Sequence, residues 1–258
     1  YRSAWMDNID RDNVTLVDAG AIANVSATIK EAVVELSKTP FNDVVVTDYM
    51  SKWVNLDAST LKIVDNTTGE AIWTAERINA AEGEPKWNII GYADDDSKWK
   101  KGDNYEGYPI LGTVEEVSRD YPGASVFIAI GNNVKRADIY RRLRGHDFPA
   151  LIDPSAQVSP TTEFKHGIYV ATEAVVQVGA EIGKFTLVGA RSFVGHDAVI
   201  GDFVNTGAGT AIAAGVKVGN GVSFFANCST MPYITVGENA WITCGTGVKE
   251  DVPAGARL

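Results

Sequence analysis

The sequence lacks the features that mark several common classes of protein. No apolar run approaches the roughly 20 residues that a membrane-spanning helix needs, and the N-terminus lacks the apolar core of a signal peptide. We therefore expect a cytoplasmic protein without a membrane span. Positive charge is also scarce, because 23 lysines and arginines stand against 33 acidic residues, a net charge of −10. This balance argues against nucleic acids and anionic membranes as partners.

Cysteine and histidine are equally rare. We interpret the two cysteines, Cys228 and Cys244, as small buried residues in a reducing compartment rather than as a disulfide. Of the three histidines, His146 follows a helix and should be exposed, and His166 suits a structural role better than a catalytic one. The third, His196, has a different setting.

A period of six residues dominates the second half of the chain. Between Ile152 and Val248, seventeen positions are spaced six apart; fifteen of them are aliphatic or Phe, and the other two, Thr206 and Thr230, are β-branched. A second series, four residues further on, begins with small or β-branched residues only. Neither a helix of period 3.6 nor a strand of period 2 produces this pattern. It is typical of a parallel β-helix built from hexapeptide repeats.

The repeat also predicts how this β-helix packs. Three repeats of six residues close one triangular coil, so the 96 residues between Ile152 and Val248 make a little over five coils. The apolar residue of each repeat points inward, and each coil buries its apolar face only against the next one. We assign residues 151–258 to the β-helix domain.

The residues before 150 alternate strands with helices. We expect strands at 14–18, 87–92 and 125–130, and helices at 22–36, after the capping box Thr113–Glu116, and after Asn133. This order predicts an α/β domain, residues 1–150, with a Rossmann-like parallel sheet. Residues 41–86 are treated as an insertion of unknown role that holds a hairpin, with strands at 61–65 and 71–75.

Three loops of this domain suggest a nucleotide site. A parallel sheet binds ligands beyond the carboxyl ends of its strands, where six candidate residues should gather: Gly20, Asp94, Asp95, Gly131, Asn132 and Asn133. The glycine at 131 lets a phosphate approach, the N–H groups of the asparagines point outward at a helix start, and the aspartates can accept hydrogen bonds from a ribose or a base. The alternative, a solvated turn at Asp94–Asp96 and an N-cap at Asn133, is equally compatible with these residues alone.

His196 has unusually small neighbours in the predicted coils. The residues that stack on it or lie beside it, one coil away, are Val178, Gly179, Ala214 and Gly215. An imidazole surrounded by such small residues leaves room for a narrow ligand, and the adjacent Asp197 can bias the tautomer of the imidazole. Because histidine titrates near neutral pH, His196 is the candidate general base.

Several segments together resemble one enzyme family. They are Gly195–Phe203 (GHDAVIGDF), Val126–Asn133 (VFIAIGNN), Ile89–Asp96 (IIGYADDD) and Gly107–Gly112 (GYPILG). Over residues 87–255, and more loosely over 14–38, the chain resembles hexapeptide-repeat acyltransferases of the sialic-acid O-acetyltransferase and bacillosamine N-acetyltransferase family. The resemblance implies left-handed coils, a homotrimer, acetyl-CoA in the cleft between adjacent helices, and a nucleotide-linked sugar held by the N-terminal domain.

The resemblance also implies roles for individual residues. His196 and Asp197 match the catalytic His-Asp/Glu pair. Relatives often carry a second histidine nine residues after the catalytic one, and bacillosamine-type members carry an asparagine seven residues before it. These positions, Asn205 and Gly189 here, touch the coenzyme and acceptor pockets. Further coenzyme contacts are expected at Gly195, Ala214 and Gly215, and a backbone N–H near Gly195 or Gly215 is the candidate donor to the oxyanion.

We therefore predict an acetyl-CoA-dependent N-acetyltransferase that acts, without a metal, on a nucleotide-linked amino-deoxysugar in the synthesis of surface-glycan precursors. One alternative is O-acetylation of a sugar, and another is a non-catalytic trimeric scaffold or nucleotide-sugar sensor. A β-helical carbonic anhydrase would need three histidine ligands for zinc. The β-helix holds only His166 and His196, and their separation is not a whole number of coils, which places them on different faces.

Overall fold

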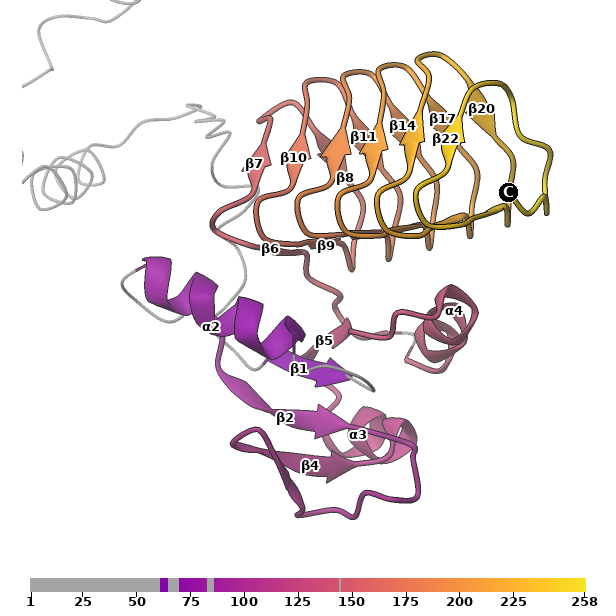
Figure 1. The fold of residues 1–258 in the computed structure, drawn as a ribbon. Helices are drawn as coiled ribbons and strands as arrows, with labels where there is room; N and C mark the ends of the chain where they lie inside the picture. Colours follow the sequence, from indigo (N-terminus) through magenta and orange to yellow (C-terminus); the bar gives the residue numbers. More distant parts are fainter. Residues whose placement is uncertain (1–60, 65–69, 83–85, 144) are drawn as a thin grey trace, which may run out of the picture. The chain divides into compact units, whose positions relative to one another are not determined.

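The computed structural model describes residues 61–64, 70–82, 86–143 and 145–258, which all belong to one compact unit of the chain, residues 56–258. An α/β region is followed by a parallel β-helix (Figure 1), as the sequence predicts. The strand expected at 14–18, the helix expected at 22–36 and the candidate Gly20 lie outside the described residues.

The α/β region is built around four parallel strands. Its elements are β1 (Leu61–Val64), α2 (Glu70–Glu82), β2 (Ile89–Ala93), β3 (Asn104–Tyr105), β4 (Tyr108–Gly112), α3 (Val114–Asp120), β5 (Ser125–Ile128) and α4 (Asn133–Arg142). The sheet order is β3-β4-β2-β1-β5, and among these described strands only β3 runs antiparallel to its neighbour. Buried residues of β2 and β5, including Tyr92 and Phe127, form its core.

The hairpin expected at 61–65 and 71–75 is wrong. Residues 70–82 form the helix α2, and β1 is an inner strand that pairs in parallel with both β2 and β5. The turn-like residues between β1 and α2 resemble a hairpin turn in sequence. However, the segment that follows them is rich in Ala and Glu, which favour a helix. Residues 61–82 thus include an inner strand of the sheet and the helix α2, so this segment is an integral part of the α/β region.

The helix predicted after Thr113 is confirmed. The Thr113 hydroxyl accepts a hydrogen bond from the backbone N–H of Glu116 (3.3 Å), and the Glu116 carboxylate accepts one from the backbone N–H of Thr113 (2.9 Å). This reciprocal pair satisfies two of the N–H groups that a helix start leaves unpaired. It fixes the direction in which α3 leaves β4.

The β-helix consists of two-residue strands that pair in parallel from each coil to the next. They are β6 (Leu151–Ile152), β7 (Gln157–Val158), β8 (Glu163–Phe164), β9 (Tyr169–Val170), β10 (Val175–Val176), β11 (Glu181–Ile182), β12 (Leu187–Val188), β13 (Phe193–Val194), β14 (Val199–Ile200), β15 (Asn205–Thr206), β16 (Ala211–Ile212), β17 (Lys217–Val218), β18 (Ser223–Phe224), β19 (Ser229–Thr230), β20 (Thr235–Val236), β21 (Trp241–Ile242) and β22 (Gly247–Val248). Every third strand lies in the same sheet, so three sheets form the sides of a triangular coil. The prediction of hexapeptide coils is confirmed, and the coils are consistent with the left-handed form.

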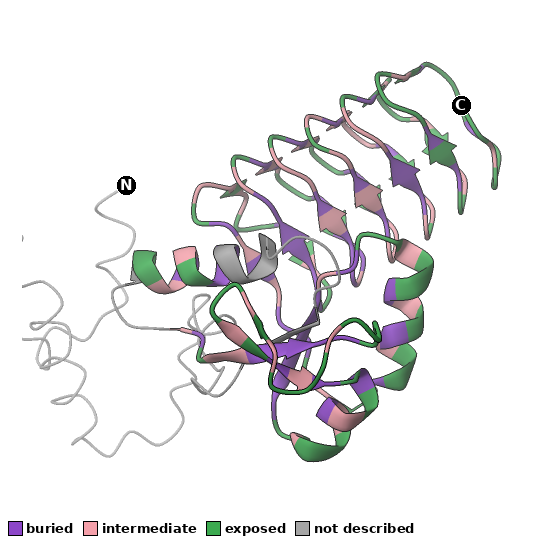
Figure 2. Ribbon diagram, turned by 60° about the horizontal axis from the view of Figure 1, so that its bottom comes forward, coloured by how far each residue is buried: buried purple, intermediate pink, exposed green. Residues whose placement is uncertain are grey.

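The six-residue column forms the core of the β-helix. Val176, Val194 and Ile212 pair in register and are at most 1% exposed. Figure 2 shows buried residues recurring from coil to coil. Cys228 lies in this core, but Cys244 is exposed, so the expectation of buried cysteines holds for Cys228 only. Because the backbone ladder and the inward column build the coils, the side chains at the outer corners are not needed for the core.

Candidate active site

His196 and Asp197 lie at an outer corner of the β-helix, between β13 and β14. Nδ1 of His196 is 2.8 Å from Oδ2 of Asp197, and the two side chains are 46% and 72% exposed. A neutral imidazole that donates from Nδ1 to the carboxylate presents its Nε2 lone pair to solvent. In that tautomer, the pair has the geometry and the exposure that a general base needs.

The corner is shaped by its backbone conformation. Asp197 adopts a left-handed φ of +58°, and its side chain folds over Gly179 in the preceding coil. A Cβ at Gly179 would lie 2.5 Å from Oδ1 of Asp197, so the carboxylate needs glycine at that position. This contact explains one of the small residues that the sequence places around His196.

The N–H groups of Gly195 and Gly215 are already used by the coils. They donate to the carbonyl oxygens of Ile212 (2.8 Å) and His196 (2.9 Å), so a donor to an oxyanion near Gly195 or Gly215 has to come from a neighbouring residue. The N–H of Ala214 makes no hydrogen bond with any residue that the structure describes.

The column of His196 explains why that donor is available. Its members at 160 and 232 are prolines, which have no N–H, so the ladder of the coils does not require a donor at this position. At His196 itself, Oε1 of Gln177 accepts the backbone N–H at 3.1 Å. One coil before and one coil after, the N–H groups of Val178 and Ala214 make no hydrogen bond with the described residues, and Ala214 is the one that adjoins Gly215.

A cavity of about 540 Å³ brings together five of the predicted residues. Gly131, Asn132 and Asn133 enter it from the loop between β5 and α4, and Gly189 and Asn205 from the β-helix. Its remaining walls are largely apolar, with the aromatic pair Phe225 and Trp241 among them. The cavity is large enough for a small organic ligand.

The cavity and His196 lie on opposite sides of the coil. The cavity residues of the β-helix follow the sheet that contains β12, β15, β18 and β21, whereas His196 sits at the corner between the other two sheets. In a triangular coil, the corner between two sides lies opposite the third side. One copy of the chain therefore does not bring His196 to its own cavity.

The loop at Gly131 is tied to the β-helix by side chains. Nδ2 of Asn205 donates to the Gly131 carbonyl (2.6 Å), and Nδ2 of Asn133 donates to the Gly221 carbonyl (2.6 Å). The N-cap of α4 is Asn132, whose side chain accepts the Lys135 N–H at 3.0 Å. The alternative of an N-cap at Asn133 is therefore wrong by one residue.

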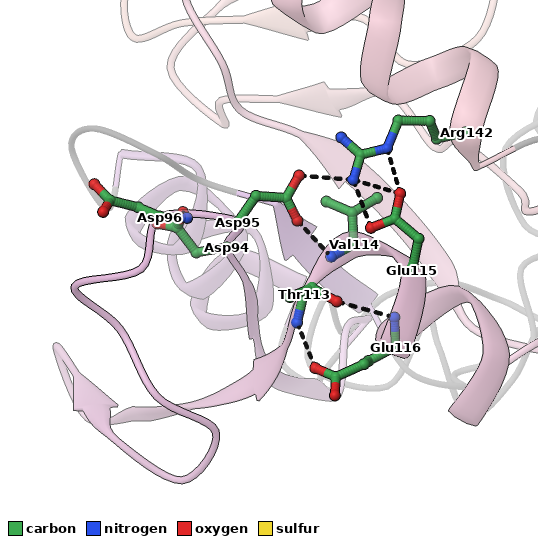
Figure 3. A network of polar contacts seen from close by, with 8 residues as sticks. All are labelled: Asp94, Asp95, Asp96, Thr113, Val114, Glu115, Glu116 and Arg142. Carbon is green, nitrogen blue, oxygen red and sulfur yellow. Dashed lines mark hydrogen bonds and ion pairs between the residues drawn. The ribbon is translucent and has the colours of Figure 1, made fainter.

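Asp94 and Asp95 belong to a polar network at the ends of β2 and β4 (Figure 3). Oδ1 of Asp94 accepts the Asp96 N–H (2.8 Å), and burial raises the pKa of the Asp94 carboxyl. Asp95 accepts the Val114 N–H at the start of α3 (2.9 Å), and its other oxygen lies 2.7 Å from Nη2 of Arg142. Asp94 is thus no solvated turn residue, and both oxygens of Asp95 already have partners within the chain.

The other two histidines are structural in their surroundings. His146, which was expected to be exposed, is instead half-buried, with its ring nitrogens 2.9 Å from the Ala124 carbonyl and 3.2 Å from the Ser118 hydroxyl. His166 packs on the rings of Phe185 and Tyr140. Within the described ranges, no group of three His, Cys, Asp or Glu side chains is placed to hold a metal ion. None of the helices in that part of the chain is long and apolar enough to cross a bilayer.

Comparisons with known proteins agree with this architecture. The PglD N-terminal domain family matches residues 75–143. Among curated proteins, the bifunctional protein GlmU of Corynebacterium aurimucosum is 32% identical over 132 residues, 44% of this chain and 26% of that protein. GlmU of Micrococcus luteus is 28% identical over 71% of this chain and 38% of its own length. The chain thus spans about a quarter to two fifths of the length of these relatives.

Two solved structures match both the α/β region and the β-helix. One is a histidine-to-asparagine variant of perosamine N-acetyltransferase from Caulobacter crescentus with CoA and GDP-perosamine (25% identity, 79% of this chain, 94% of that chain, TM-score 0.68). The other is the acetyltransferase domain of PglB from Neisseria gonorrhoeae with acetyl coenzyme A (26%, 76%, 94%, TM-score 0.68). The resemblance to hexapeptide-repeat sugar acetyltransferases is confirmed.

Proposed function

We propose that this chain, being similar to hexapeptide-repeat sugar acetyltransferases, transfers an acetyl group from acetyl-CoA to the amino group of a nucleotide-linked deoxysugar. The observation that carries the proposal is the exposed His196–Asp197 pair beside an unused backbone N–H at Ala214. A base for the attacking amine and a donor for the developing oxyanion are what acyl transfer to an amine requires. The C. crescentus and N. gonorrhoeae structures, which contain CoA, GDP-perosamine or acetyl-CoA, support the choice of substrates.

The reaction is a direct displacement. The amine nitrogen attacks the thioester carbonyl carbon, and Nε2 of His196 takes the proton that the amine loses. The N–H of Ala214 donates to the oxyanion of the tetrahedral intermediate, a type of contact worth about 3 kcal/mol in known sites. The C–S bond then breaks, the amide remains on the sugar, and the CoA sulfur receives the proton. Asp197 holds the imidazole in the tautomer that these proton transfers require.

The nucleotide is assigned to the α/β region. If the parallel strands β1, β2, β4 and β5 are numbered 1 to 4 in chain order, they lie side by side in the order 3-2-1-4, which matches the first four places of the Rossmann order 3-2-1-4-5-6. Asp94 follows β2 and the Gly131 loop follows β5, so both lie beyond carboxyl ends of strands, where such sheets bind ligands. This supports a Rossmann-like nucleotide-sugar domain ahead of the β-helix.

The complete site is assigned to a homotrimer. Because His196 lies on the side of the coil opposite the cavity, the cavity of one copy needs the histidine of another. Threefold symmetry repeats one such contact three times and closes the ring. The acetyl group then lies between the His196 corner of one copy and the cavity of its neighbour.

Mixing of two inactive variants tests the shared site. His196→Ala removes the base, and Gly131→Val obstructs the cavity; a Cβ at Gly131 meets no atom within 4 Å, so the fold tolerates the side chain. Each variant alone should transfer almost no acetyl group to a panel of nucleotide amino-sugars. Co-refolded at equal ratio, random trimers restore an intact pair at about a quarter of the sites.

The outcome separates the alternatives. Recovery near a quarter of wild-type activity supports a site shared between copies, and no recovery would refute it. Light scattering should give three times the chain mass of 27.7 kDa. An acetyl group released by mild alkali would be an ester, which would favour the sugar O-acetyltransferase instead. Tight binding of acetyl-CoA without transfer to any nucleotide sugar would contradict the enzymatic proposal.

A further inference from the structure

Arg136 is a buried cation without an acidic partner among the residues that the structure describes. It lies near the start of α4 and has no exposed surface. Burial lowers its pKa to about 9, and no neighbouring carboxylate in that part of the chain counters the shift. The guanidinium therefore stays charged at neutral pH, in an environment where an unpaired charge is costly.

The four hydrogen bonds of Arg136 join the Gly131 loop to the β-helix. Nη1 donates to the carbonyls of Ile130 (2.6 Å) and Gly131 (3.2 Å), and Nε donates to the carbonyl of Phe185 (2.8 Å). Nη2 donates to Oδ1 of Asn205 (2.6 Å). The positive charge is thus compensated by three backbone dipoles and one amide.

These contacts fix the orientation of Asn205. A guanidinium has only donors, so the Asn205 amide must turn its oxygen toward Arg136. Its NH₂ group then faces the Gly131 carbonyl and donates to it at 2.6 Å. Arg136, Asn205 and Gly131 form a closed triangle of hydrogen bonds, and two of its corners line the cavity.

Packing of α4 on the β-helix does not depend on Arg136 alone. The ring of Tyr140, also on α4, lies 4.5 Å from that of Phe185, which in turn stacks on Phe203 at 5.3 Å. Apolar residues of similar volume can replace buried ionic groups without loss of stability in several proteins. The aromatic rings hold α4 against the β-helix, and the guanidinium in addition fixes the orientation of the loop carbonyls and of one amide.

We propose that Arg136 is a positioning residue that holds the Gly131–Asn133 loop and the Asn205 amide in the geometry that the cavity needs for its ligands. It acts through these two partners and touches no substrate. The proposal rests on the proposed function only for the identity of the ligands. The hydrogen bonds that Arg136 makes with this loop and with Asn205, called the clamp below, do not depend on any ligand.

Arg136→Lys tests the clamp, with Arg141→Lys as the matched control. Lysine keeps the charge, but its single ammonium cannot reproduce the planar fork that serves four acceptors. Arg141 lies on the same helix, is exposed and pairs with Asp138 at 3.1 Å. The amides of residues 134–136 all donate to oxygen atoms of Asn132 or Asn133, so their hydrogen exchange reports on the order of the loop. It should accelerate at least tenfold in Arg136→Lys and stay at the wild-type rate in Arg141→Lys.

A kinetic measurement gives the second readout. With a nucleotide amino-sugar that the wild type acetylates, Arg136→Lys should raise KM for that substrate about tenfold, a change of about 1.4 kcal/mol, and lower kcat by less. A merely structural arginine would lower the melting temperature and leave both the exchange rates at 134–136 and KM unchanged. That result would overturn the proposal.

A second variant covers the case in which Arg136→Lys does not fold. Asn205→Asp keeps an oxygen facing the guanidinium, so an ion pair preserves the fold, but the donor to the Gly131 carbonyl becomes an acceptor. The same faster exchange at 134–136 supports the clamp, and wild-type exchange refutes it. If the wild type acetylates no nucleotide sugar, the proposed function fails while the exchange comparison still decides the role of Arg136.

Discussion

The β-helix and the α/β region hold their functional residues in different ways. In the β-helix, a repeated ladder and an inward apolar column build the fold, and His196 and Asp197 are carried at an exposed corner. In the α/β region, the candidate binding residues are also structural contacts, as Asp95 shows by capping α3 and pairing with Arg142. In the β-helix, the candidate catalytic side chains are thus separate from the residues that stabilise the fold. In the α/β region, the candidate binding residues also stabilise the fold.

The contrast has a direct consequence for substitutions. Solenoid coils interact with their nearest neighbours, so an outward corner residue can change without affecting distant coils. In the α/β region, residues such as Asp95 and Asn133 each satisfy a backbone group that would otherwise be left unpaired. Catalysis and stability should therefore separate in the β-helix and stay coupled in the α/β region.

His196→Ala should give the largest effect. Loss of the general base lowers kcat by about 10² to 10⁴, the usual contribution of positioned acid–base catalysis. The melting temperature and the trimer mass should stay near those of the wild type, because the imidazole makes no contact with the core. Steady-state kinetics and calorimetry on the same preparation measure both quantities.

His166→Ala is the control for this prediction. That imidazole packs on Phe185 at 5.3 Å, so its loss should lower the melting temperature and leave kcat within a few-fold. If instead His196→Ala unfolds the protein or keeps most of its activity, the catalytic assignment is wrong. A milder loss of rate is expected for Asp197→Asn, because the imidazole remains but loses the carboxylate that orients it.

The β-helix was largely predictable from the sequence, and the α/β region less so. A repeat of six residues leaves few alternatives, because each coil must bury the same column; register, coil number and the corner position of His196 all follow. Near Gly69, however, the turn-like residues are equally compatible with a strand or with a helix after the turn. The hairpin error arose there, because only long-range pairing places β1 between β2 and β5.

The candidate site was predicted as a set of residues, but without its internal contacts. No local pattern shows that Asn205 reaches Gly131, or that the N–H groups of Gly195 and Gly215 are already in use. Arg136 was missed altogether. One signal could have found it: Arg136, Ile139 and Leu143 follow the spacing of a buried helix face, and an arginine on such a face needs partners.

Matched glycine substitutions should sharpen the comparison of the two regions. A Cβ at Gly183 would collide with the backbone of Gly201 in the next coil, whereas one at Gly123, in the α/β region, meets no atom within 4 Å. We expect Gly183→Ala to destabilise the protein by about 1–3 kcal/mol, as overpacking does. Gly123→Ala should be neutral or stabilising by up to about 1 kcal/mol. Equal melting temperatures for the two variants would show that the coils can separate to accept a methyl group.

The smallest effect is expected from Asp94→Asn, which tests whether binding and folding are coupled in the α/β region. Burial raises the pKa of Asp94, so the folded protein binds this proton more tightly than the unfolded chain does. The stability that this contributes is present below the unfolded pKa and is lost as pH rises through the folded pKa. At neutral pH the charged carboxylate is thus a small cost, and asparagine, which still accepts the Asp96 N–H, removes it.

Asp96→Asn should show the opposite sign. The Lys98 N–H lowers the pKa of Asp96, so this carboxylate contributes stability above the unfolded pKa, and the contribution is lost as pH falls through the folded pKa. In scans between about pH 3.5 and 8, Asp94→Asn should melt slightly above the wild type at neutral pH and Asp96→Asn slightly below it, and both differences should shrink in acid. If Asp94 also binds the nucleotide, Asp94→Asn gains stability while it loses affinity, and Asp96→Asn keeps its affinity. A less stable Asp94→Asn at neutral pH would mean that the fold favours the charged carboxylate, and the cost assigned to its burial would be wrong.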